Sequence, residues 1–181
     1  SISAHSRVNG PGARTVVHFQ GCTLACAGCF NPHTWKSGAG VSYRYDTLAE
    51  IVVALGDDGL TVSGGEPFQQ DHDSLLDFLR AYRDASGKTV LVYSGYTTGE
   101  LEQLGVLAKF RDYVDTIVSG RYEQDKKTAK GLLASSNQKY IYLSNRLDMS
   151  KTKTEVEVLI DGGGVTVTGF PTRRLLSSIR R

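Results

Sequence analysis

The sequence predicts an α/β protein that forms a partial, open β/α barrel of about six parallel strands. Short segments rich in β-branched and aromatic residues alternate with amphipathic helical segments along most of the 181 residues. Such alternation is typical of parallel strands joined by right-handed crossovers. The chain is also too short for the eight strand–helix units of a closed barrel, so we expect the barrel to be open.

The first elements follow a polar start. Residues 1–14 are small and polar and include a run of Asn, Gly and Pro, so we expect a loop. Thr15 to Gln20 has the composition of a strand. A helix is expected from Thr47, because Thr47 and Glu50 form a capping-box pair and the apolar residues that follow have helical spacing. Gly56 is expected to end it.

The alternation continues through the middle of the chain. Residues 59–63 are predicted to form a short buried strand, and a helix begins near Asp71 or Asp73 and ends at Gly87. A further strand is expected at residues 88–93.

The last third is richer in strands. Thr97 and Glu100 form a second capping-box pair that opens a helix. A polar, lysine-containing loop is expected up to about Asn137. The predicted strands of this part are residues 114–119, 139–143, 155–160 and 165–168, the last two forming a hairpin around residues 161–164.

Composition excludes several classes of protein. Hydrophobic residues make up 40% and charged residues 22%, as in folded domains rather than disordered chains. The longest apolar run, Ile51 to Leu55, is far shorter than the roughly 20 residues of a membrane helix. Lys plus Arg number 21 against 19 Asp plus Glu, a near balance that argues against nucleic acid as the main ligand. We expect neither membrane insertion nor nucleic-acid binding.

The cysteines are the most informative residues. Cys22, Cys26 and Cys29 are the only three cysteines and lie within eight residues of one another. An odd number at this spacing is a poor disulfide framework, because one thiol must stay unpaired. No basic and apolar leader pattern is visible, so we expect a reducing, cytoplasmic compartment.

The spacing C-x3-C-x2-C suits a metal centre on one loop. Three thiolates can hold three corners of a cubane iron–sulfur cluster and leave the fourth iron open to a substrate or cofactor. A structural zinc site completed by His33 or His18 is the alternative. The residues favour the cluster and leave the zinc site open, although His18 is more typical of a packed residue than of a ligand.

A second motif, Gly64-Gly65-Glu66-Pro67, directly follows the predicted strand at residues 59–63. Two glycines let the backbone approach a ligand closely, and Glu66 or the exposed carbonyls can accept hydrogen bonds from an ammonium group. A glycine-rich turn without function is the alternative interpretation. Its combination with the cysteine motif favours a binding role.

Together these two motifs resemble the radical S-adenosylmethionine (radical SAM) superfamily, and further segments resemble its anaerobic ribonucleotide reductase activating enzymes. Those segments are Gly10–Arg14, Gln20–Gly21, Asn31–Trp35, Ser94–Thr97, Val114–Asp115, Ser119–Gly120 and Asn137–Gln138. The matches run from about residue 10 to residue 170. We expect a single domain over residues 1–181, with a cluster- and SAM-binding core at 15–120 and C-terminal strands and a tail at 121–181.

The resemblance implies a set of site residues. Three cysteines bind a 4Fe-4S cluster, whose open iron chelates the amino and carboxylate groups of SAM; they are Cys22, Cys26 and Cys29. The residues implied to hold the methionine part, the adenine and the ribose of SAM are Gly28, Gly64, Gly65, Glu66, Pro67, Ser94 and Ser119. Among these, Gly28 approaches the adenine, and Ser94 and Ser119 lie near the methionine and the ribose.

The resemblance also implies a reaction. SAM is cleaved reductively to methionine and a 5′-deoxyadenosyl radical, which removes a hydrogen atom from a glycine of a large glycyl radical enzyme, in this subfamily an anaerobic ribonucleotide reductase. The electron comes from a reductant of the flavodoxin or ferredoxin type. Two alternatives stay open: a small-molecule enzyme similar to 7-carboxy-7-deazaguanine synthase, and a non-catalytic zinc or iron–sulfur module.

Two positions depart from the superfamily pattern. Gly28 stands where much of the superfamily has an aromatic residue, although the activating enzymes share the glycine. Ser119 precedes Gly120 where an aspartate is more common. The basic residues near the end are typical of a solvated tail; they are Arg173, Arg174, Arg180 and Arg181.

Overall fold

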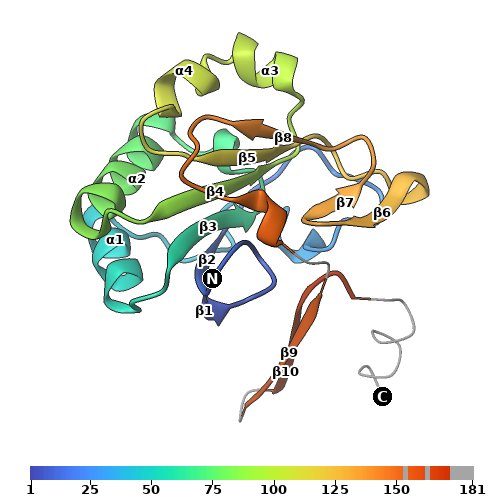
Figure 1. Ribbon diagram of the computed structural model, residues 1–181, viewed down its shortest axis with the longest axis horizontal. Coiled ribbons are helices and arrows are strands. Elements are labelled where there is room, and N and C mark those ends of the chain that lie inside the picture. The colour runs from blue at the N-terminus through green and yellow to red at the C-terminus, as the bar shows by residue number, and fades with distance from the viewer. Residues whose placement is uncertain (153–154, 162–163, 172–181) are drawn as a thin grey trace.

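The computed structural model describes residues 1–152, 155–161 and 164–171. Its centre is a six-stranded sheet in the order β1-β2-β3-β4-β5-β8 (Figure 1). The strands are β1 (Ile2–Ser6), β2 (Arg14–Phe19), β3 (Gly59–Gly64), β4 (Thr89–Ser94), β5 (Thr116–Ser119) and β8 (Lys139–Tyr142). β2 to β5 run parallel, whereas β1 and β8 pair antiparallel at the two edges. The predicted α/β class is confirmed, with four parallel strands instead of about six, in an arrangement compatible with an open barrel.

Helices cover one face of this sheet (Figure 1). They are α1 (Tyr45–Ala54), α2 (His72–Ser86), α3 (Thr98–Gln103) and α4 (Val106–Phe110). Alternate strand residues turn towards them and form one apolar core; these include Val17, Leu60, Val62, Val90, Val92 and Ile117. The period of two along each strand therefore decides which side chains meet the helices.

The observed helix ends show which starts and ends could be predicted from capping residues in the sequence. As predicted, the Asp71 carboxylate caps α2 by accepting from Ser74 N, and Gly87 ends the helix in the left-handed conformation. The prediction that Thr47 caps α1 is wrong, because the helix already begins at Tyr45 and has Arg44 at its N-cap. The Thr97 capping box is confirmed, but its helix divides into α3 and α4 at Gly105, whose φ is +70°.

Two segments predicted as loops contain strands. Residues 2–6 form β1, which pairs with β2 although it has few apolar side chains, because an edge strand is held mainly by backbone hydrogen bonds. The stretch 120–137 contains a two-stranded hairpin, β6 (Lys127–Lys130) and β7 (Leu133–Ser135). Short 3-10 turns complete the described chain at Pro32–Thr34, Pro67–Gln69, Gln124–Lys126 and Met149–Lys151.

The hairpin predicted for residues 155–168 is present as a separate two-stranded sheet. It consists of β9 (Val156–Asp161) and β10 (Gly164–Gly169), which pair antiparallel, and it projects from the body of the molecule (Figure 1). Asn9 Nδ2 donates to Thr168 Oγ1 at 2.9 Å and ties it to the first loop. Residues 162–163 of its turn and the basic tail lie outside the described residues.

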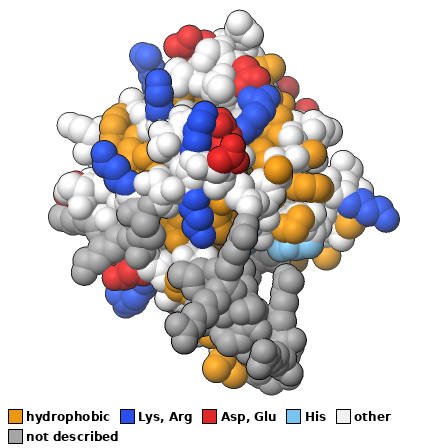
Figure 2. Space-filling view, turned by 90° about the vertical axis from the view of Figure 1, so that its right-hand side faces the viewer, with side chains coloured by type: hydrophobic (Ala, Val, Ile, Leu, Met, Phe, Trp, Pro, Cys, Tyr) orange, Lys and Arg blue, Asp and Glu red, His pale blue; other side chains and the backbone are white. Residues whose placement is uncertain are grey.

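The face that carries the β6–β7 hairpin presents Lys and Arg side chains between hydrophobic ones (Figure 2). Lys126, Lys127 and Lys130 of this region are exposed. Over the described ranges of the chain, none of the helices has the length and apolar character needed to cross a membrane.

Two buried charges stabilise the amino-terminal edge of the parallel strands. The guanidinium of Arg14 is fully buried and donates to neutral oxygens of Pro11, Leu60, Thr61 and Thr89. Burial lowers the pKa of Arg14 to about 10, so the group remains charged at neutral pH. Its N–H groups thus join the loop between β1 and β2 to β3 and β4.

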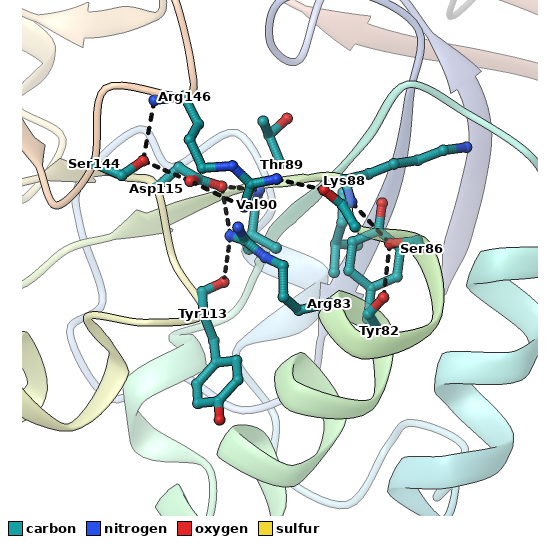
Figure 3. Close-up of polar contacts among 12 residues, drawn as sticks. Tyr82, Arg83, Ser86, Lys88, Thr89, Val90, Tyr113, Asp115, Ser144 and Arg146 are labelled. Carbon is teal, nitrogen blue, oxygen red and sulfur yellow. Dashed lines mark hydrogen bonds and ion pairs between the residues drawn. The ribbon is translucent and has the colours of Figure 1, made fainter.

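Asp115, 1% exposed, is the second of these charges (Figure 3). Its Oδ2 accepts from Arg83 Nη2 at 2.6 Å and from Val90 N at 2.7 Å, and its Oδ1 accepts from Ser144 Oγ at 2.6 Å. One carboxylate therefore connects α2, β4 and the turn after β8.

Candidate functional site

The candidate site lies where the parallel strands end. The cysteine loop follows β2, the Gly-Gly-Glu-Pro turn follows β3, and β4 and β5 end at Ser94 and Ser119. Phe19 is in register with Gly64, and Ser94 with Ser119. Because the carboxyl ends of parallel strands share one edge, the fold brings the predicted site residues together there.

The cysteine loop carries three free thiols. Cys22, Cys26 and Cys29 are each partly exposed, and none forms a disulfide. Cys22 N donates to Trp35 O, and Cys29 N to Cys26 O, both at 3.1 Å, so the loop has a defined turn. Burial raises the pKa of the Cys22 thiol above its usual value, and metal binding must therefore release its proton. Three soft donors on one folded loop fit an iron–sulfur cluster.

The side-chain positions alone do not distinguish a cluster from a single ion. Within the part of the chain that the structure describes, no three His, Cys, Asp or Glu side chains, the three cysteines included, are grouped so as to hold one metal ion. His18 is largely buried, and burial, followed by the terminal ammonium group and His33, lowers its pKa to about 4. Its Nδ1 has no hydrogen-bond partner among the described residues. His18 is thus neutral and packed at neutral pH.

The two glycines after β3 pack against the start of the cysteine loop. Gly65 N donates to Phe19 O at 2.8 Å, and Glu66 N donates to Gly21 O at 2.9 Å. A β-carbon on Gly65 would collide with the Gly21 carbonyl, and one on Gly64, whose φ is +99°, would stand 2.5 Å from Phe19 N. These glycines therefore bring the chain's own backbone segments together, beside Cys22.

The carboxylate of Glu66 is 1% exposed and turned into the protein. It accepts from Gly95 N at 2.7 Å, Ser94 Oγ at 2.9 Å and Phe68 N at 3.1 Å. Burial outweighs these hydrogen bonds and raises the pKa of Glu66 to about 7. The carboxylate therefore joins the turns after β3 and β4. Pro67 follows it as the first, buried residue of a 3-10 turn.

Residues not singled out from the sequence hold the cysteine loop from the next two turns. A β-carbon on Gly95 would collide with Leu24 Cδ1, so Leu24 lies directly on the turn after β4. Gln69 accepts from Thr23 N at 2.9 Å and donates to Thr23 Oγ1 at 2.8 Å. The position of Gln69, two residues after Pro67 of the Gly-Gly-Glu-Pro motif, was the signal that could have identified it.

The turn after β5 completes the site. Ser119 Oγ donates to Lys139 O at 3.4 Å, and Gly120 N lies within hydrogen-bond distance of Ser94 O and Tyr96 O. Gly28 has a φ of +76° and lies against Gln124 and Tyr122 of the following loop. The cysteine loop is thus contacted by three successive turns of the sheet, which we call the three-turn clamp: residues 64–70, 94–96 and 120–124.

Comparisons with known proteins agree with this site. A family described as a 4Fe-4S single cluster domain matches residues 8–141. This supports the cluster rather than zinc at the three cysteines.

Named relatives point the same way. An anaerobic ribonucleoside-triphosphate reductase-activating protein of Pasteurella multocida is 33% identical over 142 residues, which cover 75% of this chain and 90% of that protein. Proteins of the same name from Enterobacteria phage T4 and Escherichia coli K12 are 32% and 29% identical, and the matches cover 85% and 91% of their lengths. The chain therefore belongs to the family of anaerobic ribonucleoside-triphosphate reductase-activating proteins, with a 4Fe-4S single cluster domain.

Proposed function

We propose that this chain is a radical SAM enzyme that installs a glycyl radical on an anaerobic ribonucleoside-triphosphate reductase. The observation that carries the proposal is the cysteine loop, whose three free thiols lie at the carboxyl edge of the parallel strands. Family membership supports the same reaction and disfavours the small-molecule alternative. The reductase named by the relatives is the proposed partner.

The chemistry comes from the bound groups. Cys22, Cys26 and Cys29 would hold a 4Fe-4S cluster, which would supply the single electron for reductive cleavage of SAM and so for removal of a hydrogen atom from the partner's glycine. The protein's part is to bind, orient and exclude water. The three-turn clamp contributes to the orienting step, because it fixes the position of the loop that carries the three thiols.

The chain's own residues divide this work. The backbone of Gly64 and Gly65 accepts from the methionine ammonium group, and Glu66 keeps that turn joined to Ser94. Ser119 and Gly28 lie on the side proposed for the nucleoside. Pro67 directs the chain from the glycine turn into the packed 3-10 turn.

The proposal extends to the cellular context and the chain as a whole. Residues 1–181 act as a single domain in the cytoplasm and receive the electron from a flavodoxin- or ferredoxin-type protein. An open barrel leaves the side of the cluster accessible, so that a glycine loop of a folded partner can enter. Selectivity then depends on which hydrogen atom is held near the radical, at about 3–3.5 Å.

The test uses protein reconstituted without oxygen. It should bind about four irons per chain, the number in a cubane, and replacement of Cys22, Cys26 or Cys29 by Ala should abolish SAM cleavage. Mixed with the reductase, SAM and a reductant, the parent should produce a glycine-centred doublet in electron paramagnetic resonance. The doublet should vanish when the target glycine of the reductase becomes alanine.

Two outcomes would refute the proposal. One tightly bound zinc in a colourless protein would exclude the radical reaction. Conversion of a small molecule that accelerates 5′-deoxyadenosine formation, with no doublet on the reductase, would favour the small-molecule alternative.

A further inference from the structure

One face of the β9–β10 hairpin is made of branched aliphatic side chains. Successive residues of a strand point to opposite faces, and residues directly opposite each other in an antiparallel pair share a face. Ile160 is in register with Val165, and Val158 is in register with Val167. One face of the hairpin therefore carries what we call the aliphatic stripe: Val156, Val158, Ile160, Val165 and Val167.

Much of the aliphatic stripe is open to solvent. The exposed fractions are 79% for Ile160, 47% for Val165 and 41% for Val158. Single hydrophobic residues are common on the surface of folded proteins, whereas a contiguous group of them marks a site of interaction or a risk of aggregation. The stripe is therefore a surface suited to contact with another molecule.

The opposite face of the hairpin makes polar contacts with the loop between β1 and β2. Glu157 Oε1 accepts from Arg7 N at 3.2 Å, and Thr168 Oγ1 accepts from Asn9 Nδ2 at 2.9 Å. Glu157 and Thr168 are in register with each other, so they share the face opposite the stripe. These contacts attach the hairpin to the body of the molecule through its polar face.

The base of the hairpin lies beside the cysteine loop. Phe170 directly follows β10, and its ring centroid lies 6.4 Å from that of Phe30, which directly follows Cys29. Phe170 N also donates to Glu155 O at 3.0 Å, which closes the base of the hairpin. Under the proposed function, the glycine of the partner must reach the cluster on this loop, and the partner's surface then comes next to the hairpin.

We propose that the aliphatic stripe is a docking surface for the anaerobic ribonucleoside-triphosphate reductase, and that it packs against an apolar patch of that partner. The inference rests on the proposed function and specifies a surface for its partner. The hairpin lies outside residues 8–141, the segment that matches the single cluster domain, and all the proposed cluster and SAM residues lie inside that segment. The stripe therefore sets the affinity for the reductase and leaves the cleavage of SAM unaffected.

The reductase fits this surface better than a second copy of the chain or an electron donor does. Three exposed aliphatic side chains supply far less area than the roughly 800 Å² per partner of a stable interface, so the stripe by itself does not hold two copies together. An electron donor binds briefly through a small interface, whereas the reductase must keep one glycine positioned for reaction. The stripe extends the contact around the cysteine loop, which is what such a partner requires.

The experiment measures affinity for the purified reductase. Reconstituted parent and variants are titrated with it calorimetrically, without oxygen. The double variant Ile160→Thr/Val165→Thr keeps β-branched side chains, which suit a strand, but places hydroxyl groups on the stripe. It should bind the reductase about tenfold more weakly or worse, as when central apolar contacts of an interface are removed. Its iron content, and its cleavage of SAM with dithionite in the absence of the reductase, should equal the parent's.

Two further variants serve as controls. Ile160→Val keeps the stripe aliphatic and should bind like the parent. Tyr142→Thr is the matched surface control, because Tyr142 is a strand residue that is 58% exposed and in register with Thr116, the first residue of β5, away from the candidate site. It should also bind the reductase like the parent.

The outcomes separate this inference from the proposed function. Equal affinity of the parent and the double variant for the reductase would overturn the inference and leave the proposed function intact. Light scattering gives the oligomeric state, and a parent dimer that the double variant divides into monomers would show that the stripe binds a second copy instead. If the parent neither binds the reductase nor produces the glycine-centred doublet, the proposed function itself fails, and this inference fails with it.

Discussion

At the scale of single residues, Gly65 is constrained by the chain's own backbone. Its α-carbon lies so close to Gly21 that even a methyl group would collide there. The amides of Gly65 and Glu66 both donate across this contact. A change at Gly65 therefore affects the loop that carries Cys22 as well as any ligand on the glycine turn.

Replacing Gly65 by Val should therefore destabilise the protein and impair iron binding together. Forcing a branched side chain against packed backbone costs about 3 kcal/mol, the upper end for overpacking. Urea denaturation and iron analysis of the same preparation test this. Gly99→Ala is the matched control, because nothing lies within 4 Å of the added carbon, and it should leave both quantities near the parent's. Normal iron content in Gly65→Val would contradict the expectation.

Glu66 makes a pH-dependent contribution to stability. Burial raises its pKa in the folded state to about 7, from the usual glutamate value of 4.5. Between these values the folded chain holds a proton that the unfolded chain has released, so the free energy of unfolding falls as pH rises and levels off above 7. His18 acts in the opposite direction, since its lowered pKa makes stability rise between about pH 4 and 6.5.

The variant Glu66→Gln should lack the Glu66 contribution. The difference in free energy of unfolding between parent and variant should shift by on the order of 2 kcal/mol between pH 5 and pH 8, with the parent losing stability relative to the variant. Denaturant titrations at several pH values measure it, and His18 cancels because both proteins contain it. A constant difference across this range would show that Glu66 is already ionised at pH 5.

At the scale of elements, the amino-terminal edge of the sheet depends on Asp115. This carboxylate is buried and joins three elements, and Arg83, its ion-pair partner, has a side chain only 12% exposed (Figure 3). Removing one partner of a buried pair leaves the other charge without compensation. The edge opposite the candidate site is thus a point of structural vulnerability.

Asp115→Asn should lower the free energy of unfolding by about 3–5 kcal/mol, the usual cost of breaking a buried pair. The control is Asp77→Asn, which removes the i, i+3 pair with Arg80 on the surface of α2. That variant should change stability by less than about 1 kcal/mol. Urea denaturation measures both variants. Equal losses of stability would contradict the conclusion that the buried Asp115–Arg83 pair stabilises the fold more than the exposed Asp77–Arg80 pair does.

The elements also show how far the sequence alone could lead. α2 was predictable because Asp71 and Gly87 act locally on their own helix ends. β1 and the β6–β7 hairpin were not, because polar segments can pair through backbone alone and leave no apolar pattern. The antiparallel direction of β8 was equally hidden, since direction depends on the path of the chain between β5 and β8.

For the site, the motifs gave the turns but not their contacts with one another. The family resemblance implied that Cys22, Gly64 and Ser94 belong to one site, and the fold places them at the carboxyl ends of neighbouring parallel strands. The contacts of Leu24 with Gly95 and of Tyr122 with Gly28 join residues far apart in the chain. No local pattern in the sequence encodes such contacts. They form only when the strand–helix–strand units of the sheet have packed side by side and their turns meet.

At the scale of the whole molecule, the parallel sheet is finished at both edges by antiparallel strands. β1 and β8 limit the sheet to six strands, and a closed ring of eight units is not formed. The helices cover one face, while the opposite face is filled by Leu91, Val118, Leu132, Leu147 and Met149. The carboxyl edge of β2 to β5 therefore carries the three-turn clamp, while the buried charges secure the opposite edge.

The three-turn clamp has a consequence for how the cell maintains this protein. A ligand that binds only the folded loop adds RT ln(1 + [L]/Kd) to the free energy of unfolding, by mass action. Under the proposed function, that ligand is the iron–sulfur cluster, and its supply becomes a determinant of protein lifetime. A cell short of iron keeps a larger share of the chain in opened forms, on which proteases act. The abundance of this protein should then follow the iron supply without any change in its synthesis.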